Sequence, residues 1–254
     1  MKYFLTAIWA LVCIGVLAYS HIHWNQQTAV EAVEPELEPV VKKASNNSNN
    51  IEIYMKLAKN WPQTAKEQFK LALEEEKPFR ILFVGSSASE WEKAVSQNII
   101  ESYGSKRITT AKQIYDVTSE EYLAENKHVE LAVEKAQLVV IEPFLLIDNG
   151  TITIDATLSN LTEIIEAVKA KNPNTTFILQ PSNPIYLPKY YATQVEGLKG
   201  YAKENNLTYL DHWTAWPATD DPKIKDYVVE GKKGPTEKGN EAWAQFLVEY
   251  FVNK

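Results

Sequence analysis

Apolar residues in this chain alternate between short dense runs and longer stretches with helical spacing. The strand-like segments are 79–84, 113–117, 138–141, 176–179 and 207–210. The segments with helical spacing are 53–61, 62–75, 118–136, 154–171, 188–205 and 235–252. Strands that alternate with long helices indicate βαβ units. We therefore predict a three-layer α/β/α fold with a flavodoxin-like parallel sheet of about five strands.

The N-terminal pattern differs from the rest. Residues 3–20 carry no charge and are almost all apolar, which is close to the length of a membrane-spanning helix. Lys2 precedes this run and favours a cytoplasmic N-terminus. The small residues Ala18 and Ser20 leave open the alternative of a signal peptide cleaved near Ser20, after which the protein is secreted. Either alternative places the following chain outside the cytoplasm.

Residues 25–50 contain interleaved Glu and Pro, followed by Asn and Ser, and have no apolar periodicity. Such a segment buries too little apolar area to offset its ordering entropy, so we predict a flexible linker. The expected organisation is thus a membrane anchor or signal segment (1–24), a linker (25–50) and a folded domain (51–254).

The composition of the chain excludes several classes of function. The chain has 254 residues and a net charge of −7, which argues against nucleic-acid binding. Its one cysteine excludes an internal disulfide and a zinc site with several thiolates. The GSSAS sequence after the first strand lacks the lysine and the second glycine of a phosphate-binding loop. We expect no cofactor and no metal.

Candidate chemistry lies beyond the carboxyl ends of the strands, where ligands bind in doubly wound sheets. The first strand leads into Ser86 and Ser87, just before a helix. A serine on such a turn is exposed near the positive end of the helix and suits a nucleophile. Capping of the helix is the alternative role for these serines.

A serine nucleophile needs a base within hydrogen-bond reach, and the chain has four histidines. His21 and His23 lie at the edge of the apolar N-terminal segment, and His128 lies on a charged helix. His212 follows the strand at 207–210 and is therefore expected on the same rim as Ser87. Packing of His212 against neighbouring tryptophans is the alternative.

Two further loops follow strands on this rim. Glu142 begins one loop, which continues to Asp148 and Asn149, a possible acid partner and oxyanion donor. Asp148-Asn149-Gly150 is also an ordinary turn sequence, and a hairpin into residues 151–153 is a further alternative. The other loop, 180–184, brings Asn183 to the rim.

These loops together resemble the SGNH/GDSL hydrolase superfamily, from about Phe79 to the C-terminus. The family's strand followed by Gly-Asp-Ser is similar to residues 81–87, which gives Ser87 the place of the nucleophile. The family's last block, Asp-x-x-His-Pro-Asn-x-x-Gly, resembles residues 231–239, but Gly231 and Gly234 stand where the Asp and His are usual. The Glu-Pro-Phe-Leu-Leu loop and residues 211–217 are similar to a cell-envelope branch of Gram-positive bacteria.

The resemblance implies one of two functions. The first is an extracytoplasmic serine esterase or acyl transferase with Ser87 as nucleophile, His212 as base and Asp148 as acid partner. The Ser87 N–H and Asn149 would then hold the oxyanion, and the substrate site would include Ser86, Glu142 and Asn183. The second is a catalytically degenerate domain that binds cell-wall glycan or scaffolds other envelope proteins. The expected partners are a small acyl ester or an acylated cell-envelope polysaccharide, and the membrane through the N-terminal segment.

Overall fold

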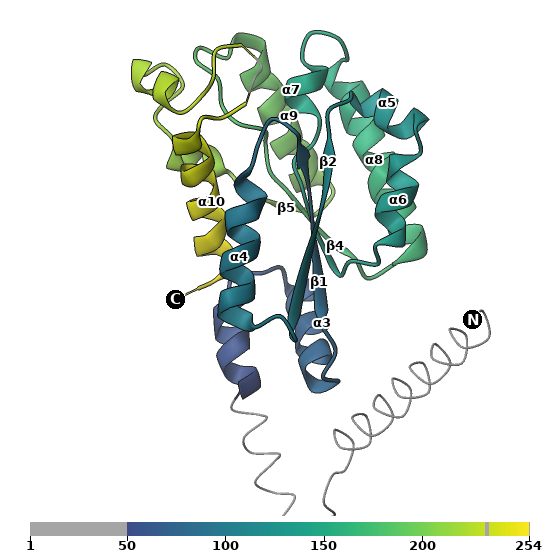
Figure 1. Ribbon diagram of the computed structural model, residues 1–254. Helices are drawn as coiled ribbons and strands as arrows, with labels where there is room; N and C mark the ends of the chain where they lie inside the picture. The colour runs from purple at the N-terminus through teal and green to yellow at the C-terminus, as the bar shows by residue number, and fades with distance from the viewer. Residues whose placement is uncertain (1–49, 232–233, 254) are drawn as a thin grey trace, which may run out of the picture. The chain divides into compact units, whose positions relative to one another are not determined.

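The computed structural model describes residues 50–231 and 234–253, so the predictions for the N-terminal segment and for most of the linker lie outside it (Figure 1). Its strands are β1 (Phe79–Ser86), β2 (Ile108–Tyr115), β3 (Leu138–Ile141), β4 (Thr176–Leu179) and β5 (Thr208–Tyr209). They form one sheet in the order β2-β1-β3-β4-β5, and every neighbouring pair is parallel. This is the flavodoxin-like strand order, and the fold prediction is confirmed.

The central strand β1 shows why the sheet has two covered faces. Its successive side chains point to opposite faces, as in any strand. Ile81 and Phe83 pack in one buried apolar cluster, and Leu82 and Val84 pack in the other. Both faces exclude water, so the strand is apolar along its whole length instead of alternating.

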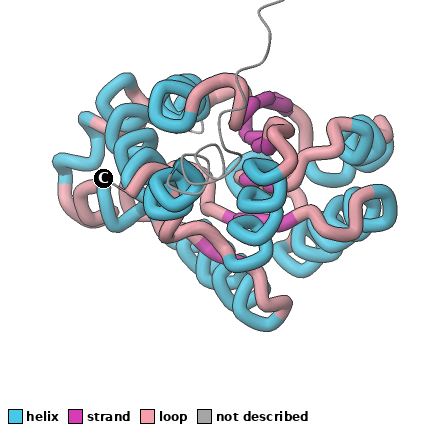
Figure 2. The backbone as a smooth tube through the Cα atoms, turned by 90° about the horizontal axis from the view of Figure 1, so that it is seen from below, coloured by secondary structure: helices cyan, strands magenta, loops and turns pink. Residues whose placement is uncertain are grey.

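Helices cover both faces of the sheet, and Figure 2 shows them around the strands from below. One face is covered by α3 (Gln63–Glu74), α4 (Trp91–Tyr103) and α10 (Glu237–Phe251). The other is covered by α5 (Ser119–Ala124), α6 (Lys127–Val133), α8 (Ile154–Lys171) and α9 (Lys189–Glu204). A further helix spans residues 50–57. Shorter elements are α7 (Leu145–Asp148), η1 (His212–Ala215) and η2 (Pro222–Asp226).

Two elements differ from the expectation. Strand β2 begins at Ile108, well before the expected segment 113–117. The sequence did not reveal this start because β2 is an edge strand with several polar, half-exposed residues and no dense apolar run. The single helix expected over 118–136 is divided into α5 and α6. The division falls at Asn126, whose φ of +58° interrupts the helical backbone.

The loop after β3 also decides between the alternatives for residues 149–153. Residues 149–151 form a turn, and Thr153 caps α8 by accepting a hydrogen bond from the N–H of Ala156. The turn interpretation is therefore confirmed, and the hairpin alternative is wrong. Within the described residues, none of the helices has the length and apolar character that crossing a membrane requires.

Candidate functional site

Ser87 lies on the turn between the carboxyl end of β1 and the start of α4, and its side chain is exposed. It lines a cavity of about 420 Å³ together with Ser89 and Lys112. The two histidines in the described part of the chain, His128 and His212, are not among the residues that line this cavity. The structure thus places an exposed hydroxyl at the rim, and neither described histidine contributes to the cavity that it lines.

The backbone N–H groups of this turn are bonded within the protein. The Ser86 N–H donates to Oε2 of Glu142 at 3.1 Å, and the Ala88 N–H donates to Oγ of Ser86 at 3.2 Å. The Ser87 N–H donates to the Tyr115 carbonyl at 2.7 Å, which extends the pairing of β1 with β2. An oxyanion hole requires N–H groups that point at the substrate. In this arrangement, the Ser87 N–H does not serve the oxyanion role expected for it, and Ser86 acts inside the turn.

Glu142 lies beneath the serine turn and is only 1% exposed. Its Oε2 accepts hydrogen bonds from the Ser86 N–H and, at 3.3 Å, from the Ser89 hydroxyl. Burial raises the pKa of the Glu142 carboxyl to about 7, although the hydrogen bond from Ser86 opposes this shift. The structure therefore places Glu142 as a support of the turn and not at the substrate surface, where the sequence had suggested it.

His212 is fully buried. Its Nε2 lies 2.8 Å from the Pro181 carbonyl, and its Nδ1 accepts the indole N–H of Trp216 at 3.0 Å. These two bonds define a neutral imidazole that carries its proton on Nε2. Its ring also stacks on Trp243 with centroids 4.0 Å apart.

This environment determines the chemistry open to His212. Burial lowers the pKa of His212 to about 3. Both ring nitrogens are engaged, so no lone pair remains to accept a proton from Ser87. Within the described residues, no hydrogen bond joins His212 to Ser87, and His212 has the alternative arrangement of a histidine packed among tryptophans.

Asp148 is buried and fully bonded. Its carboxylate accepts the Ser119 N–H at 3.0 Å and the hydroxyls of Ser119 and Thr157, each at 2.6 Å. These bonds join α5, α7 and α8. A carboxylate with three donors of its own ties helices together, and no hydrogen bond joins it to a histidine in the described residues.

The two predicted amide residues also lie within loops. Asn149 is half-buried, and its N–H donates to the Leu145 carbonyl at the end of α7. Asn183 is buried, and its amide donates to the Pro184 carbonyl at 3.0 Å. The structure thus brings none of Asp148, Asn149 and Asn183 into the cavity beside Ser87.

Gly234, at the position where the resembled family has its histidine, packs directly on the serine turn. Its φ is +92°, and a Cβ built there would lie 2.1 Å from the Ala88 carbonyl oxygen. No L-residue side chain fits at this position without movement of the backbone. Thr236 then caps α10 by accepting the Gly239 N–H at 3.3 Å. Gly234 therefore lies against the serine turn but has no side chain that could act as a base.

Trp243 is a further residue of this region that the sequence did not single out, and it packs against both His212 and Trp91. It stacks on His212 and also on Trp91, with centroids 5.4 Å apart in the second pair. Its indole N–H donates to Oε1 of Gln180 at 2.9 Å. The only signal in the sequence was a tryptophan on the apolar face of the last helix, which does not distinguish this role from ordinary packing.

Comparisons with known proteins place the fold. No family model and no curated protein matches the chain. A GDSL-like lipase from Parabacteroides merdae superposes with a TM-score of 0.58 at 13% identity, covering 69% of this chain and 96% of its own. A catalytic mutant of an acetylxylan esterase from Geobacillus stearothermophilus gives a TM-score of 0.57 at 14% identity, covering 69% and 94%. A lipase/acylhydrolase from Enterococcus faecalis gives 0.53 at 18% identity, covering 67% and 94%.

These structures share the α/β fold of GDSL/SGNH esterases and acylhydrolases with this chain. Because the identities are low, the likeness concerns the fold, while function depends on the residues of the site.

Proposed function

We propose that this chain is an SGNH/GDSL-fold protein of the cell envelope that binds an O-acylated polymer at the Ser87 rim without serine–histidine hydrolysis. One observation carries the proposal: Ser87 is exposed beside a cavity of about 420 Å³, while the two positions where a histidine base was expected are closed. His212 is bonded at both nitrogens, and Gly234 leaves no space for a side chain.

The proposed ligand class rests on three supports. The cavity is lined by charged and hydroxyl side chains, including Glu90, Lys93 and Lys112, which suit a polar polymer better than a lipid. One protein of similar fold is an acetylxylan esterase, whose name describes an acetylated polysaccharide as its substrate. The apolar segment at residues 3–20 favours a location outside the cytoplasm, behind a single membrane span.

A serine esterase or acyl transferase is the second candidate, and the exposure of Ser87 at the end of β1 favours it. In that reaction, Oγ of Ser87 bonds to the ester carbonyl carbon and its proton passes to a base. The alcohol leaves with a proton, and water or another acceptor then releases the acyl group from the serine. For His212 to be this base, its bond from Trp216 must break first.

One pair of assays on the full chain separates the two candidates. In the first, the chain and its Ser87→Ala variant are treated with a fluorophosphonate probe and assayed with an activated acetyl ester. In the second, both proteins are sedimented with O-acetylated peptidoglycan and with the same material after mild alkaline deacetylation.

We expect no Ser87-dependent labelling or turnover, and stronger binding to the acetylated material than to the deacetylated material. Labelling that disappears in Ser87→Ala would establish the esterase instead. Equal binding to both materials, without labelling, would overturn both candidates.

A further inference from the structure

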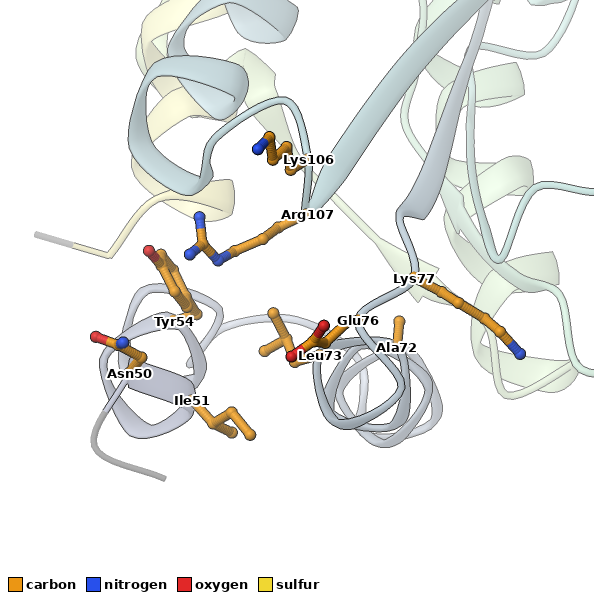
Figure 3. Close-up of a pocket in the computed structure, with 9 residues that line it drawn as sticks. All are labelled: Asn50, Ile51, Tyr54, Ala72, Leu73, Glu76, Lys77, Lys106 and Arg107. Carbon is orange, nitrogen blue, oxygen red and sulfur yellow. The ribbon is translucent and has the colours of Figure 1, made fainter. Parts of the chain in front are cut away.

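A second cavity lies at the opposite end of the sheet from Ser87, where β1 and β2 begin (Figure 3). Its volume is about 260 Å³. Three segments form it: the helix over 50–57, the end of α3 with the turn that follows, and the turn between α4 and β2. The lining residues are Asn50, Ile51, Tyr54, Ala72, Leu73, Glu76, Lys77, Lys106 and Arg107.

Arg107 is held in a fixed orientation on one side of this cavity. Its guanidinium lies over the Tyr54 ring, 4.4 Å from the centroid, and one of its nitrogens donates to the Tyr103 carbonyl at 3.3 Å. Within residues 50–231 and 234–253, no carboxylate forms an ion pair with Arg107 or with its neighbour Lys106. A planar set of donors that is already positioned and lacks an acidic partner suits a phosphate or a carboxylate.

Glu76 lies across the cavity from Arg107 (Figure 3). Its φ is +53°, in the left-handed region, because it closes the turn after α3. The Lys77 N–H donates to the Ala72 carbonyl across this turn at 2.9 Å. Glycine is the usual residue at such a position, since any side chain strains the backbone there. A carboxylate kept at a strained position on a cavity points to a function for its charge.

The charges that line the cavity define the ligand. Lys77 is paired with Glu75 at 2.8 Å, so its charge is already balanced. Lys106 and Arg107 then supply two positive charges, and Glu76 supplies one negative charge, with no ion pair between them. A ligand that complements this set carries one ammonium group and a phosphate, whose charge is about −1 in a diester and about −1.5 to −2 in a monoester.

We propose that this cavity binds a small zwitterion in which a phosphate and an ammonium group are joined by a short carbon chain, such as phosphoethanolamine. The phosphate lies on the Arg107 guanidinium, Lys106 adds positive charge at the edge of the cavity, and the ammonium lies on Glu76. The carbon chain contacts the apolar wall formed by Leu73. Free phosphoethanolamine and an ethanolamine phospholipid head group share this chemistry.

The test is calorimetric titration of the full chain, in detergent micelles, with four soluble probes. They are O-phosphoethanolamine, glycerophosphoethanolamine, inorganic phosphate and ethanolamine. We expect at least one of the first two to bind about tenfold more tightly than phosphate or ethanolamine alone. Tighter binding of O-phosphoethanolamine identifies a free phosphomonoester as the ligand, and tighter binding of glycerophosphoethanolamine identifies a lipid head group. No binding of either overturns the proposal.

Three variants test which ligand group the charges of Arg107 and Glu76 bind. Arg107→Lys keeps the positive charge but loses the stacked, forked geometry, so it should weaken the zwitterion and inorganic phosphate alike by about tenfold. Glu76→Gln should remove the preference for the zwitterion over phosphate. Glu74→Gln is the matched control, because Glu74 lies two residues from Glu76 and pairs with Lys70, and neither of them lines the cavity; the binding of this variant should equal that of the unaltered chain. If Arg107→Lys binds the zwitterion as tightly as the unaltered chain does, or if Glu76→Gln still prefers the zwitterion to phosphate, then the probe binds at another site and the proposal is wrong.

Discussion

The two ends of the sheet satisfy their polar groups in opposite ways. At the Ser87 end, the N–H groups of the turn, the Glu142 carboxylate and both nitrogens of His212 all bond to other parts of the protein. At the opposite end, Arg107 and Glu76 line a cavity, and neither forms an ion pair with another described residue. A group that binds or transforms a ligand must retain bonding capacity for it. The residues expected to act with Ser87 therefore retain less bonding capacity for a ligand than Arg107 and Glu76 do.

Burial explains much of this difference. Glu142 and His212 are both fully enclosed, and burial moves their pKa values in opposite directions, to about 7 and about 3. Both shifts favour the neutral form, because a low-dielectric interior disfavours charge of either sign. At the Ser87 end of the sheet, Glu142 and His212 thus belong to the interior of the protein, while the Ser87 side chain is exposed.

The largest expected effect is at Gly234. In Gly234→Ala the new methyl group would collide with the Ala88 carbonyl oxygen, and the residue would also be strained at a φ of +92°. We expect the free energy of unfolding of the full chain to fall by about 3–5 kcal/mol, measured by urea denaturation with tryptophan fluorescence.

Gly231 is the matched control for Gly234. Its φ is +80°, but a Cβ there meets nothing within 4 Å. Gly231→Ala should therefore lower stability only by the backbone strain, about 1–2 kcal/mol. If both variants lose the same amount of stability, the packing of Gly234 on the serine turn is not what closes the site.

The contrast between the two ends also shows which features the sequence could predict. Helix α8 and strands β3 and β4 were predicted with their observed bounds, because their periodicity is strong and their ends carry clear signals. Ser87 was placed at the rim because a single strand-to-turn transition determines its position. Strand β2 was misplaced at its start because an edge strand is partly exposed and lacks a dense apolar run.

The roles of the other site residues could not be predicted from local sequence. His212 was placed at the correct strand end, but its partners, Pro181, Trp216 and Trp243, come from separate segments. Asp148 likewise accepts a hydrogen bond from Ser119, which lies on a different helix far earlier in the sequence. Whether a polar side chain points to solvent or to the interior depends on such distant contacts, which no short pattern contains.

The second prediction concerns the pH dependence of stability that Glu142 produces. Its pKa is about 7 in the folded chain and near the ordinary value of 4.5 in the unfolded chain. Between these values the folded state holds a proton that the unfolded state has released. The stabilisation is therefore complete below pH 4.5 and is lost as the pH rises through 7, by about 3 kcal/mol.

His212 titrates with the opposite sign and must be separated from Glu142. Its pKa is lowered from 6.5 to about 3, so its contribution is complete above pH 6.5 and is lost as the pH falls towards 3. Glu142→Gln retains His212, so the difference in unfolding free energy between the unaltered chain and this variant isolates Glu142. We expect that difference to decrease from pH 4.5 to about pH 8. A difference independent of pH would show that Glu142 is not enclosed as described.

The smallest effect tests the other end of the sheet. Glu76→Gly relieves about 1–2 kcal/mol of left-handed backbone strain but adds flexibility to the unfolded chain. We expect the free energy of unfolding to increase by about 0.5–1 kcal/mol while the preference for the zwitterion over phosphate is lost. Lys135→Gly is the matched control, because Lys135 has a similar φ of +50° and lies outside the cavity, so it should gain stability and keep binding. A gain in stability at both positions with binding unchanged at both would mean that Glu76 is strained for no functional reason, and that the two ends differ less than their bonding suggests.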